Sequence, residues 1–173
     1  EYIPEIIDAG INSLKIEGRM KTALYVATVA RTYRKALDDF AESEEKYRAN
    51  MDWYRSEISK CTYRQFTTGF YFGKPDENTQ IYDSNTYIKA YTYLGLIGES
   101  RGDGYYALEQ RNKFSVGDVL DVLPVGGVPF EITVNEIINS HGESVDSAPH
   151  AMEKIEIPTD RDIPSGSILR KKL

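Results

Sequence analysis

The sequence contains few of the residues that build disulfides and metal centres. Of its 173 residues, one is a cysteine (Cys61) and two are histidines (His141 and His150). One cysteine cannot form an intrachain disulfide, and it cannot hold a zinc ion or an iron–sulfur cluster alone. We therefore expect no metal site and no cofactor in this chain. Because such a composition suits a reducing compartment, we also expect a cytoplasmic protein.

Long apolar runs and an excess of positive charge are also missing. No run of about 18 apolar residues occurs, so no membrane-spanning segment is expected. The 21 Lys and Arg residues against 27 Asp and Glu residues give a formal net charge of −6. This excludes a basic surface over the whole chain, but a local basic patch for RNA stays open. The sequence starts without Met and without a signal peptide, which fits a processed protein or a part of a longer one.

Proline and glycine are scarce only at the start, where residues 1–60 hold one proline and two glycines. The pattern there predicts a helix over Tyr2–Ala9, a short strand over Ile11–Ile16 and a long helix over Lys21–Glu42. One face of the long helix is apolar, and this apolar stripe consists of Val26, Val29, Ala30, Tyr33, Leu37 and Phe40. Since one strand between two helices cannot make a sheet, we expect its partner strands to lie outside this chain.

The remaining residues change character twice. Residues 43–60 predict a charged turn and then a second helix, which Asn50 could cap. Residues 61–85 are too aromatic for a flexible linker, so we expect them to pack. From Thr86 onwards β-prone runs alternate with turns, and the expected strands are Thr86–Gly98, Tyr105–Gln110, Val119–Pro124, Val128–Ile138, Met152–Ile157 and Ser167–Lys171. Their regular spacing predicts a small antiparallel β-barrel or a sandwich.

Three charged residues at the end of the first expected strand are candidate catalytic residues. Lys15 and Glu17 are two apart, so in a strand they would point the same way, with Arg19 just beyond. In an α/β barrel the loop after a strand carries the chemistry. Two cations and one carboxylate could bind an anionic substrate group or orient an acid–base residue. The alternative is a surface cluster of ion pairs.

Tyrosine is frequent in the second half of the chain, at Tyr63, Tyr71, Tyr82, Tyr87, Tyr91, Tyr93, Tyr105 and Tyr106. Exposed tyrosines next to Arg and Lys can bind single-stranded RNA or a peptide by stacking. The alternative is that most of these rings pack inside the protein. We take Tyr71 and Arg64 as candidate substrate-binding residues.

Several stretches together resemble the collagenase-like peptidase family, also called peptidase family U32. They are Asp8–Lys21, Tyr25–Ala27, Tyr33–Ala36, Thr67–Gly73 and Ser147–Met152. The resemblance implies an α+β protein in which residues 1–46 form the last helix–strand–helix unit of a catalytic TIM-type α/β barrel. Residues 47–85 would be a helical and aromatic connector, and residues 86–173 a C-terminal β-barrel. Phe114–Asp118 and Pro164–Arg170 are also similar to the second domain of translation elongation factors.

The resemblance implies two activities, because members are called collagen-degrading peptidases or take part in hydroxylating tRNA or rRNA. The catalytic apparatus and the cysteines of an iron–sulfur cluster would lie upstream, so we expect this chain to be inactive alone. Its β-barrel would help to recognise a peptide or RNA substrate, or pack on the catalytic barrel. The alternatives are part of a tRNA uridine hydroxylation protein, or a free-standing interaction module. The unpaired Ile11–Ile16 strand could also join two copies as a homodimer.

Overall fold

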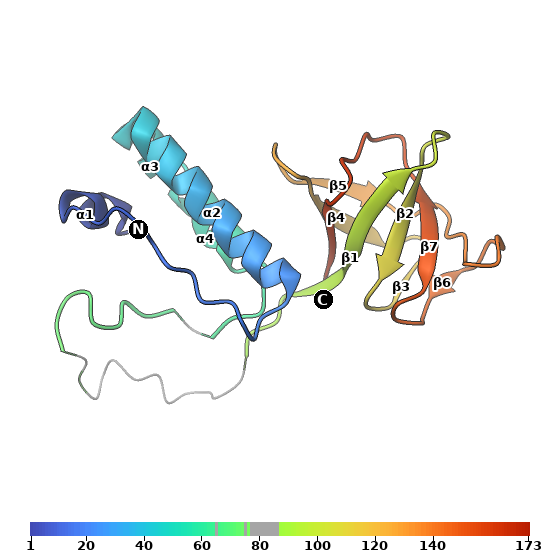
Figure 1. The fold of residues 1–173 in the computed structure, drawn as a ribbon, viewed down its shortest axis with the longest axis horizontal. Helices are drawn as coiled ribbons and strands as arrows, with labels where there is room; N and C mark the ends of the chain where they lie inside the picture. The colour runs from blue at the N-terminus through green and yellow to red at the C-terminus, as the bar shows by residue number, and fades with distance from the viewer. Residues whose placement is uncertain (65, 75, 77–86) are drawn as a thin grey trace. The chain divides into compact units, whose positions relative to one another are not determined.

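The computed structural model describes residues 1–64, 66–74, 76 and 87–173. They form two units, Glu1–Ala90 and Tyr91–Leu173 (Figure 1). The first unit is helical and the second consists of strands, so the fold class is α+β, as the sequence predicts. Residues 77–85 of the expected connector, with Tyr82, and the expected strand start at Thr86 lie outside the described residues. No described helix has the length and apolar content needed to cross a membrane.

Local capping signals explain where the helices of the first unit begin. The helices are α1 (Ile3–Asp8), α2 (Ala23–Glu42), α3 (Glu44–Ala49) and α4 (Met51–Ile58). The side chains of Thr22 and Ser43 accept hydrogen bonds from backbone N–H groups in the first turns of α2 and α3. The charged turn expected after α2 is therefore a helix. The Asn50 side chain does not cap α4, because its Nδ2 donates to Asp39 at 3.0 Å.

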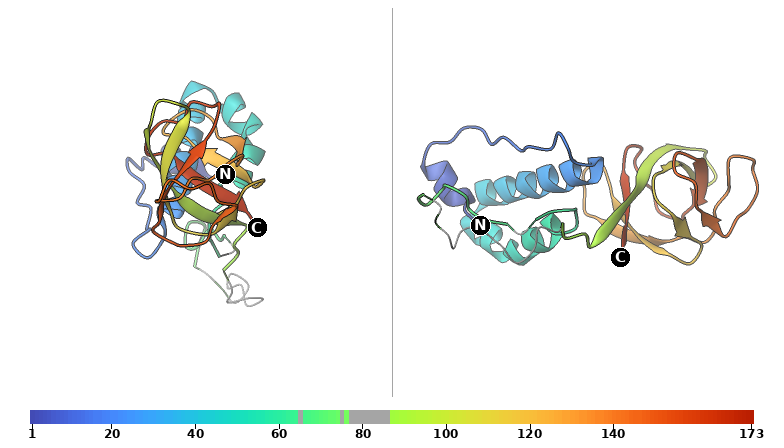
Figure 2. Two further views of the ribbon diagram at one scale, coloured as in Figure 1. Left: turned by 90° about the vertical axis from the view of Figure 1, so that its right-hand side faces the viewer. Right: turned by 90° about the horizontal axis from the view of Figure 1, so that it is seen from below.

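The strand predicted over Ile11–Ile16 is not formed. Residues 11–18 are coil and run back along α2 (Figures 1 and 2), where Gly18 lies against the side chain of Val26. A strand is stable only when a neighbouring strand accepts and donates its backbone hydrogen bonds. The described residues of Glu1–Ala90 offer no strand beside this segment. Ile11 and Ile16 therefore stay exposed.

Helix α2 buries a different face from the one predicted. Its buried residues are Leu24, Thr28, Val29, Thr32, Ala36 and Asp39. Ala36 packs with Ile3 of α1, Tyr47 of α3 and Tyr54 of α4 in the core of this unit. Of the predicted apolar stripe, Val29 is buried, whereas Val26, Ala30 and Tyr33 are exposed. Leu37 and Phe40 are half-buried against this core, so the other three helices leave half of the apolar stripe open.

Asp39 joins three helices through its buried carboxylate. Its Oδ2 accepts hydrogen bonds from Lys35 Nζ at 2.7 Å, Tyr54 Oη at 2.5 Å and Asn50 Nδ2 at 3.0 Å. Burial raises the pKa of Asp39, but these hydrogen bonds outweigh it, so the pKa lies below its usual value. Burial and the bond to Asp39 both raise the pKa of Tyr54. The ionised carboxylate therefore stabilises this helix packing.

The second unit contains a six-stranded antiparallel sheet with the order β5-β4-β8-β1-β2-β7. Its strands are β1 (Tyr91–Ser100), β2 (Tyr105–Gln110), β4 (Val119–Leu123), β5 (Phe130–Thr133), β7 (Lys154–Pro158) and β8 (Ile168–Lys172). Two short strands, β3 (Phe114–Ser115) and β6 (Ser147–Ala148), form a second sheet that the sequence did not predict. Strand β5 is also much shorter than the predicted 128–138, because only Phe130–Thr133 of that range pair with β4.

The large sheet curls without closing into the expected barrel. Its outer strands β5 and β7 share no ladder. Instead Ile138, beyond β5, exchanges two backbone hydrogen bonds of 2.9 Å with Glu156 of β7. Strand β1 carries two irregularities in register, and bulges of this kind bend a strand. At one of them Gly95 has φ +153°, and a Cβ there would lie 2.3 Å from the carbonyl oxygen of Glu109.

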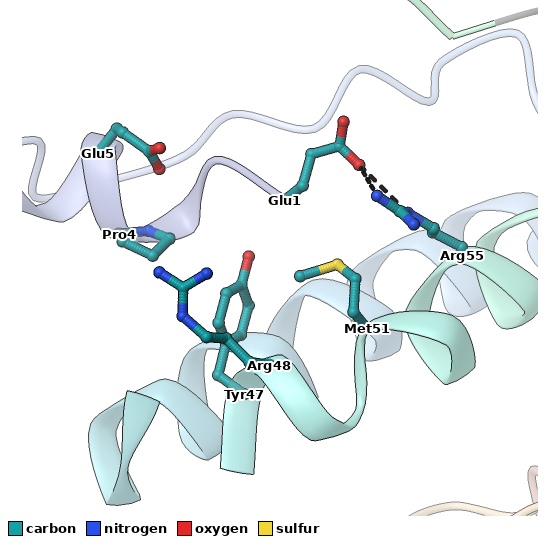
Figure 3. A pocket seen from close by; sticks show the side chains of 7 residues that line it. All are labelled: Glu1, Pro4, Glu5, Tyr47, Arg48, Met51 and Arg55. Atoms are coloured by element: carbon teal, nitrogen blue, oxygen red, sulfur yellow. Dashed lines mark hydrogen bonds and ion pairs between the residues drawn. The ribbon is translucent and has the colours of Figure 1, made fainter. Parts of the chain in front are cut away.

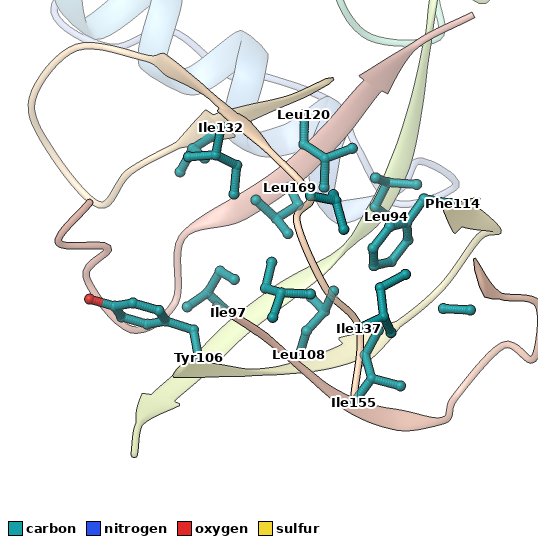
Figure 4. Close-up of a cluster of buried hydrophobic side chains, with 14 of the residues drawn as sticks. Leu94, Ile97, Tyr106, Leu108, Phe114, Leu120, Ile132, Ile137, Ile155 and Leu169 are labelled. Atoms are coloured by element: carbon teal, nitrogen blue, oxygen red, sulfur yellow. The ribbon is translucent and has the colours of Figure 1, made fainter. Parts of the chain in front are cut away.

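The concave side of the curled sheet holds the core of the second unit (Figure 4). Its members are mainly Leu, Ile and Val, and they include Leu94, Ile97, Leu108, Leu120, Ile137, Ile155 and Leu169. Burying each such side chain contributes about 1.5–3 kcal/mol. The buried Gln110 connects the core to the small sheet, because its Nε2 donates to the carbonyl oxygen of Ala148 at 2.6 Å.

Candidate functional site

The three candidate catalytic residues lie in the coil before α2. Glu17 organises this group, because its Oε1 accepts the backbone N–H of Arg19 at 2.8 Å and its Oε2 lies 3.8 Å from Lys15 Nζ. Glu17 thus contacts the side chain of Lys15 and the backbone, but not the side chain, of Arg19. The side chains of Lys15 and Glu17 are 87% and 71% exposed. The group can attract an anion from solvent, and its catalytic role stays a prediction.

The two candidate substrate-binding residues occupy separate positions. Tyr71 lies in the turn after Thr68 and is 71% exposed. It is close to Tyr33 of α2, which is 36% exposed and whose pKa is raised by partial burial and, to a smaller extent, by Tyr71. Arg64 instead places its guanidinium over the ring of Tyr87, with Cζ 4.8 Å from the ring centroid. No contact joins Tyr71 to Arg64 among the residues that the structure describes.

A backbone pair fixes the position of Arg64. The N–H of Tyr63 donates to the carbonyl oxygen of Ile88 at 3.1 Å, and the N–H of Ile88 donates back to Tyr63 at 2.8 Å. This isolated antiparallel bridge joins the two ends of the segment between them. It places Arg64 and Tyr87 next to each other, since both are direct neighbours of the bridged residues.

Further rings and a second cation complete what we call the aromatic–cation cluster: Lys21, Tyr63, Arg64, Phe66 and Tyr87. Lys21 Nζ lies 4.3 Å from the centroid of the Tyr87 ring. The rings of Tyr63 and Phe66 are stacked with centroids 4.6 Å apart and an interplanar angle of 7°. Phe66 is 55% exposed and Tyr87 47% exposed. The cluster therefore presents both aromatic surface and positive charge to solvent.

Sequence reasoning identified Arg64 but not the cluster around it. Lys21 and Phe66 were not candidates, and Tyr63 and Tyr87 were two of many tyrosines. The available signal was the alternation of basic and aromatic residues in Tyr63-Arg64-Gln65-Phe66 and in Tyr87-Ile88-Lys89. That signal could not show that the two stretches pair.

A charged pocket of the first unit is lined by Glu1, Glu5, Arg48 and Arg55 (Figure 3). Arg55 donates from Nε and Nη2 to Glu1 Oε2, at 3.2 and 2.7 Å, and these bonds lower the pKa of Glu1. Arg48 is paired with Glu44 of its own helix at 2.5 Å. The hydroxyl of Tyr47 points into the pocket, and burial raises its pKa. Because each guanidinium has a carboxylate partner, the pocket offers no unpaired cation for an anionic ligand.

The cysteine and the histidines do not form a reactive centre with one another. Cys61 is buried, and its thiol donates to the carbonyl oxygen of Ile58 at 3.2 Å. His141 and His150 are exposed in turns of the second unit. In the described part of the chain, no three His, Cys, Asp or Glu side chains are grouped so that they could hold a metal ion.

The sequence is similar to curated proteins that are named either tRNA hydroxylation proteins or a collagenase. It is 33% identical to tRNA hydroxylation protein P1 of Bacillus subtilis over 99% of this chain and 40% of that protein. It is 30% identical to tRNA hydroxylation protein P of Escherichia coli over 94% of this chain and 35% of that protein. A collagenase of Porphyromonas gingivalis is 29% identical over 98% of this chain and 41% of its own length. The chain thus spans about two fifths or less of these relatives.

Family models match both units. Residues 1–81 match the model of peptidase family U32, and residues 89–170 match that of the peptidase family U32 C-terminal domain. A crystal structure of the C-terminal domain of a U32-family protein from Geobacillus thermoleovorans is 23% identical, with a TM-score of 0.43, and covers 46% of this chain and 99% of that chain. Since two models of one family match successive parts of the sequence, the chain belongs to peptidase family U32.

Proposed function

We propose that this chain is the C-terminal part of a larger U32-family protein and is inactive alone. Residues 1–46 would be the last unit of a catalytic TIM-type α/β barrel, residues 47–85 a connector, and residues 86–173 an accessory domain. The accessory domain, a variant of the small barrel of translation elongation factors, would help to recognise substrate or pack on the catalytic barrel. The main support is coverage: relatives match almost all of this chain with only about 40% of their own length.

The exposed apolar residues of the first unit support an upstream domain. Val26 and Tyr33 of α2 are 43% and 36% exposed, and Ile11 of the coil beside α2 is 52% exposed. Large apolar side chains exposed along one helix are typical of an interface. The occupant we propose is the rest of the catalytic barrel, which would also supply the neighbouring strand that Ile11–Ile16 needs. Any iron–sulfur cluster would be held by that upstream domain.

For the whole protein we favour hydroxylation of tRNA uridine in the cytoplasm. The relatives named tRNA hydroxylation proteins include those with 33% and 30% identity over nearly the whole chain. The aromatic–cation cluster adds surface chemistry suited to RNA. Peptide hydrolysis is the second candidate, because the collagenase of Porphyromonas gingivalis matches 98% of the chain.

One experiment tests both candidates. The full-length gene is deleted, and the tRNA nucleosides are then measured by mass spectrometry. We expect loss of hydroxyuridine-derived nucleosides, and their return when the full-length gene is supplied. Expression of this chain alone should not restore them. Unchanged nucleosides together with a loss of collagen cleavage would contradict the RNA proposal and favour the peptidase.

The candidate catalytic residues are tested in the same strain. Full-length protein with Glu17→Gln should lose activity, because the amide no longer carries the charge that holds Lys15. Full-length protein with Asp38→Asn is a matched control, since Asp38 is an exposed carboxylate on α2 that pairs with Arg34. Equal activity of both variants would show that Lys15, Glu17 and Arg19 form only a surface ion-pair group.

A further inference from the structure

Among the described residues, the two cations of the aromatic–cation cluster contact rings and not carboxylates. Lys21 and Arg64 both lie over Tyr87, and neither has an ion-pair partner in the part of the chain that the structure describes. Glu17, the acidic residue nearest to Lys21 in sequence, is engaged by Lys15 and by the backbone of Arg19. Most other cations of this unit are neutralised, as Arg34, Lys35, Lys46, Arg48 and Arg55 are. The cluster therefore keeps local positive charge in a chain whose net charge is −6.

The same cluster holds a flat stacked pair of rings. Tyr63 and Phe66 are nearly parallel at 7°, and Phe66 is 55% exposed. A nucleobase could extend this stack on the exposed side of Phe66, because every base has a π-face. The bridge between Tyr63 and Ile88 fixes the backbone at Tyr63, one of the two stacked residues, before any ligand binds. A pre-ordered platform lowers the entropy lost on binding.

We propose that the aromatic–cation cluster is a binding site for single-stranded RNA. A base stacks on Phe66, and phosphate groups contact Arg64 and Lys21. The inference rests on the proposed role in tRNA hydroxylation and adds to it the surface that holds the RNA. A neutral peptide fits the cluster less well, because it would leave Lys21 and Arg64 without the anion that both cations lack among the described residues.

Binding of fluorescein-labelled oligouridylate to the 173-residue chain, followed by fluorescence anisotropy, tests the site. Phe66→Ala should weaken binding about tenfold, and Phe66→Leu should behave similarly because it keeps an apolar side chain but no ring. Phe66→Tyr keeps an aromatic ring and should bind with the affinity of the unchanged chain. Arg64→Gln should lower the slope of log K against log salt by about 0.7.

Matched controls separate the site from general effects. Phe70→Ala removes an aromatic ring that is 80% exposed elsewhere in the same unit. Lys113→Gln removes an exposed lysine of the second unit that has no ion-pair partner among the described residues. Both controls should bind like the unchanged chain. Circular dichroism of each variant verifies that it is folded.

The outcomes show separately whether the proposed RNA site fails and whether the proposed function fails. No binding of oligouridylate, or equal binding by the Phe66 variants, would overturn the site while leaving the nucleoside measurement to decide the function. Binding of a gelatin peptide that depends on Phe66, without binding of RNA, would overturn it in favour of peptide recognition. If Phe66 governs RNA binding but gene deletion leaves tRNA nucleosides unchanged, the site stands and tRNA hydroxylation does not.

Discussion

Asp121 of β4 and Arg170 of β8 lie directly opposite each other in the sheet, with 2.6 Å between Asp121 Oδ2 and Arg170 Nη2. The Arg170 side chain is fully buried, and its Nε also donates to Asp121, at 2.7 Å. The ring of Tyr91 lies 5.3 Å from Arg170 Cζ. A buried guanidinium is tolerated only when charge and hydrogen bonds compensate the loss of water. Asp121 therefore holds together the neighbouring strands β4 and β8, which contribute Leu120, Val122 and Leu169 to the core.

Removing that carboxylate should unfold the second unit more easily. We expect Asp121→Ala to lower the free energy of unfolding by about 3 kcal/mol, because a buried charge loses its partner. Amide hydrogen exchange of β4 and β8 measures this, since the single tryptophan, Trp53, lies in the first unit. Asp160→Ala, at an exposed loop residue, is the control and should change little. A small effect of Asp121→Ala would show that Arg170 does not depend on this carboxylate.

Acid should loosen the first unit through Asp39. The pKa of Asp39 is lowered in the folded chain, so its contribution is complete above the pKa of an unfolded aspartate, about 3.9, and is lost as the pH falls through the folded pKa. Asp39→Asn should cost about 2 kcal/mol at neutral pH and remove this acid dependence. The fluorescence of Trp53 reports the change, because Lys35 lies over its ring at 5.6 Å. Asp38→Asn, at the neighbouring exposed carboxylate, should leave the acid transition in place.

Gly95 should not accept a side chain. A Cβ there would meet the Glu109 carbonyl oxygen at 2.3 Å and Leu108 at 2.8 Å, and φ is +153°. We expect Gly95→Ala to cost about 3 kcal/mol or more, because both the backbone and the β1–β2 pairing must shift. Gly127→Ala, which also has positive φ but no atom within 4 Å, should cost about 1 kcal/mol. Thermal unfolding of the two variants compares them, and equal melting temperatures would refute the close approach.

The exposed face of α2 should make the isolated chain self-associate. Tyr33→Asp places a charge in this apolar surface and should shift the chain towards monomer in sedimentation experiments. Val128→Asp, at a residue of the second unit that is 75% exposed, is the control and should have no such effect. In the full-length protein Tyr33→Asp should instead reduce stability, because the proposed upstream barrel covers this face. A monomeric unchanged chain whose residues 11–18 resist proteolysis would contradict self-association.

The sequence predicted those elements whose signals are local. The helix predicted over Lys21–Glu42 is α2, Ala23–Glu42, and β2 was predicted at its observed residues, after the turn that Arg101–Gly104 predicts. The inner face of α2 could not be predicted in the same way. Thr28, Thr32 and Asp39 are buried because α3 and α4 pack there, and the periodicity of the helix alone favours the apolar side.

Predictions that depended on distant partners were wrong or incomplete. The strand over Ile11–Ile16 needed a neighbour that the described chain lacks, and barrel closure depended on pairing between β5 and β7. Dependence on a distant partner also explains why the candidate site was predicted only in part. Arg64 was recognisable as a cation among aromatic residues, whereas its contact with Tyr87 depends on the bridge between Tyr63 and Ile88.

Because of that bridge, the positions of Tyr63 and Ile88 do not depend directly on how many residues connect them. Because Tyr63 and Ile88 bond to each other, the stretch that connects them contributes to their positions mainly through the entropy of loop closure. Doubling such a loop costs only about 0.6 kcal/mol. A change in the number of residues between Phe66 and Tyr87 therefore need not separate Arg64 from Tyr87, so the length of the connector can vary while the residues of the cluster stay the same.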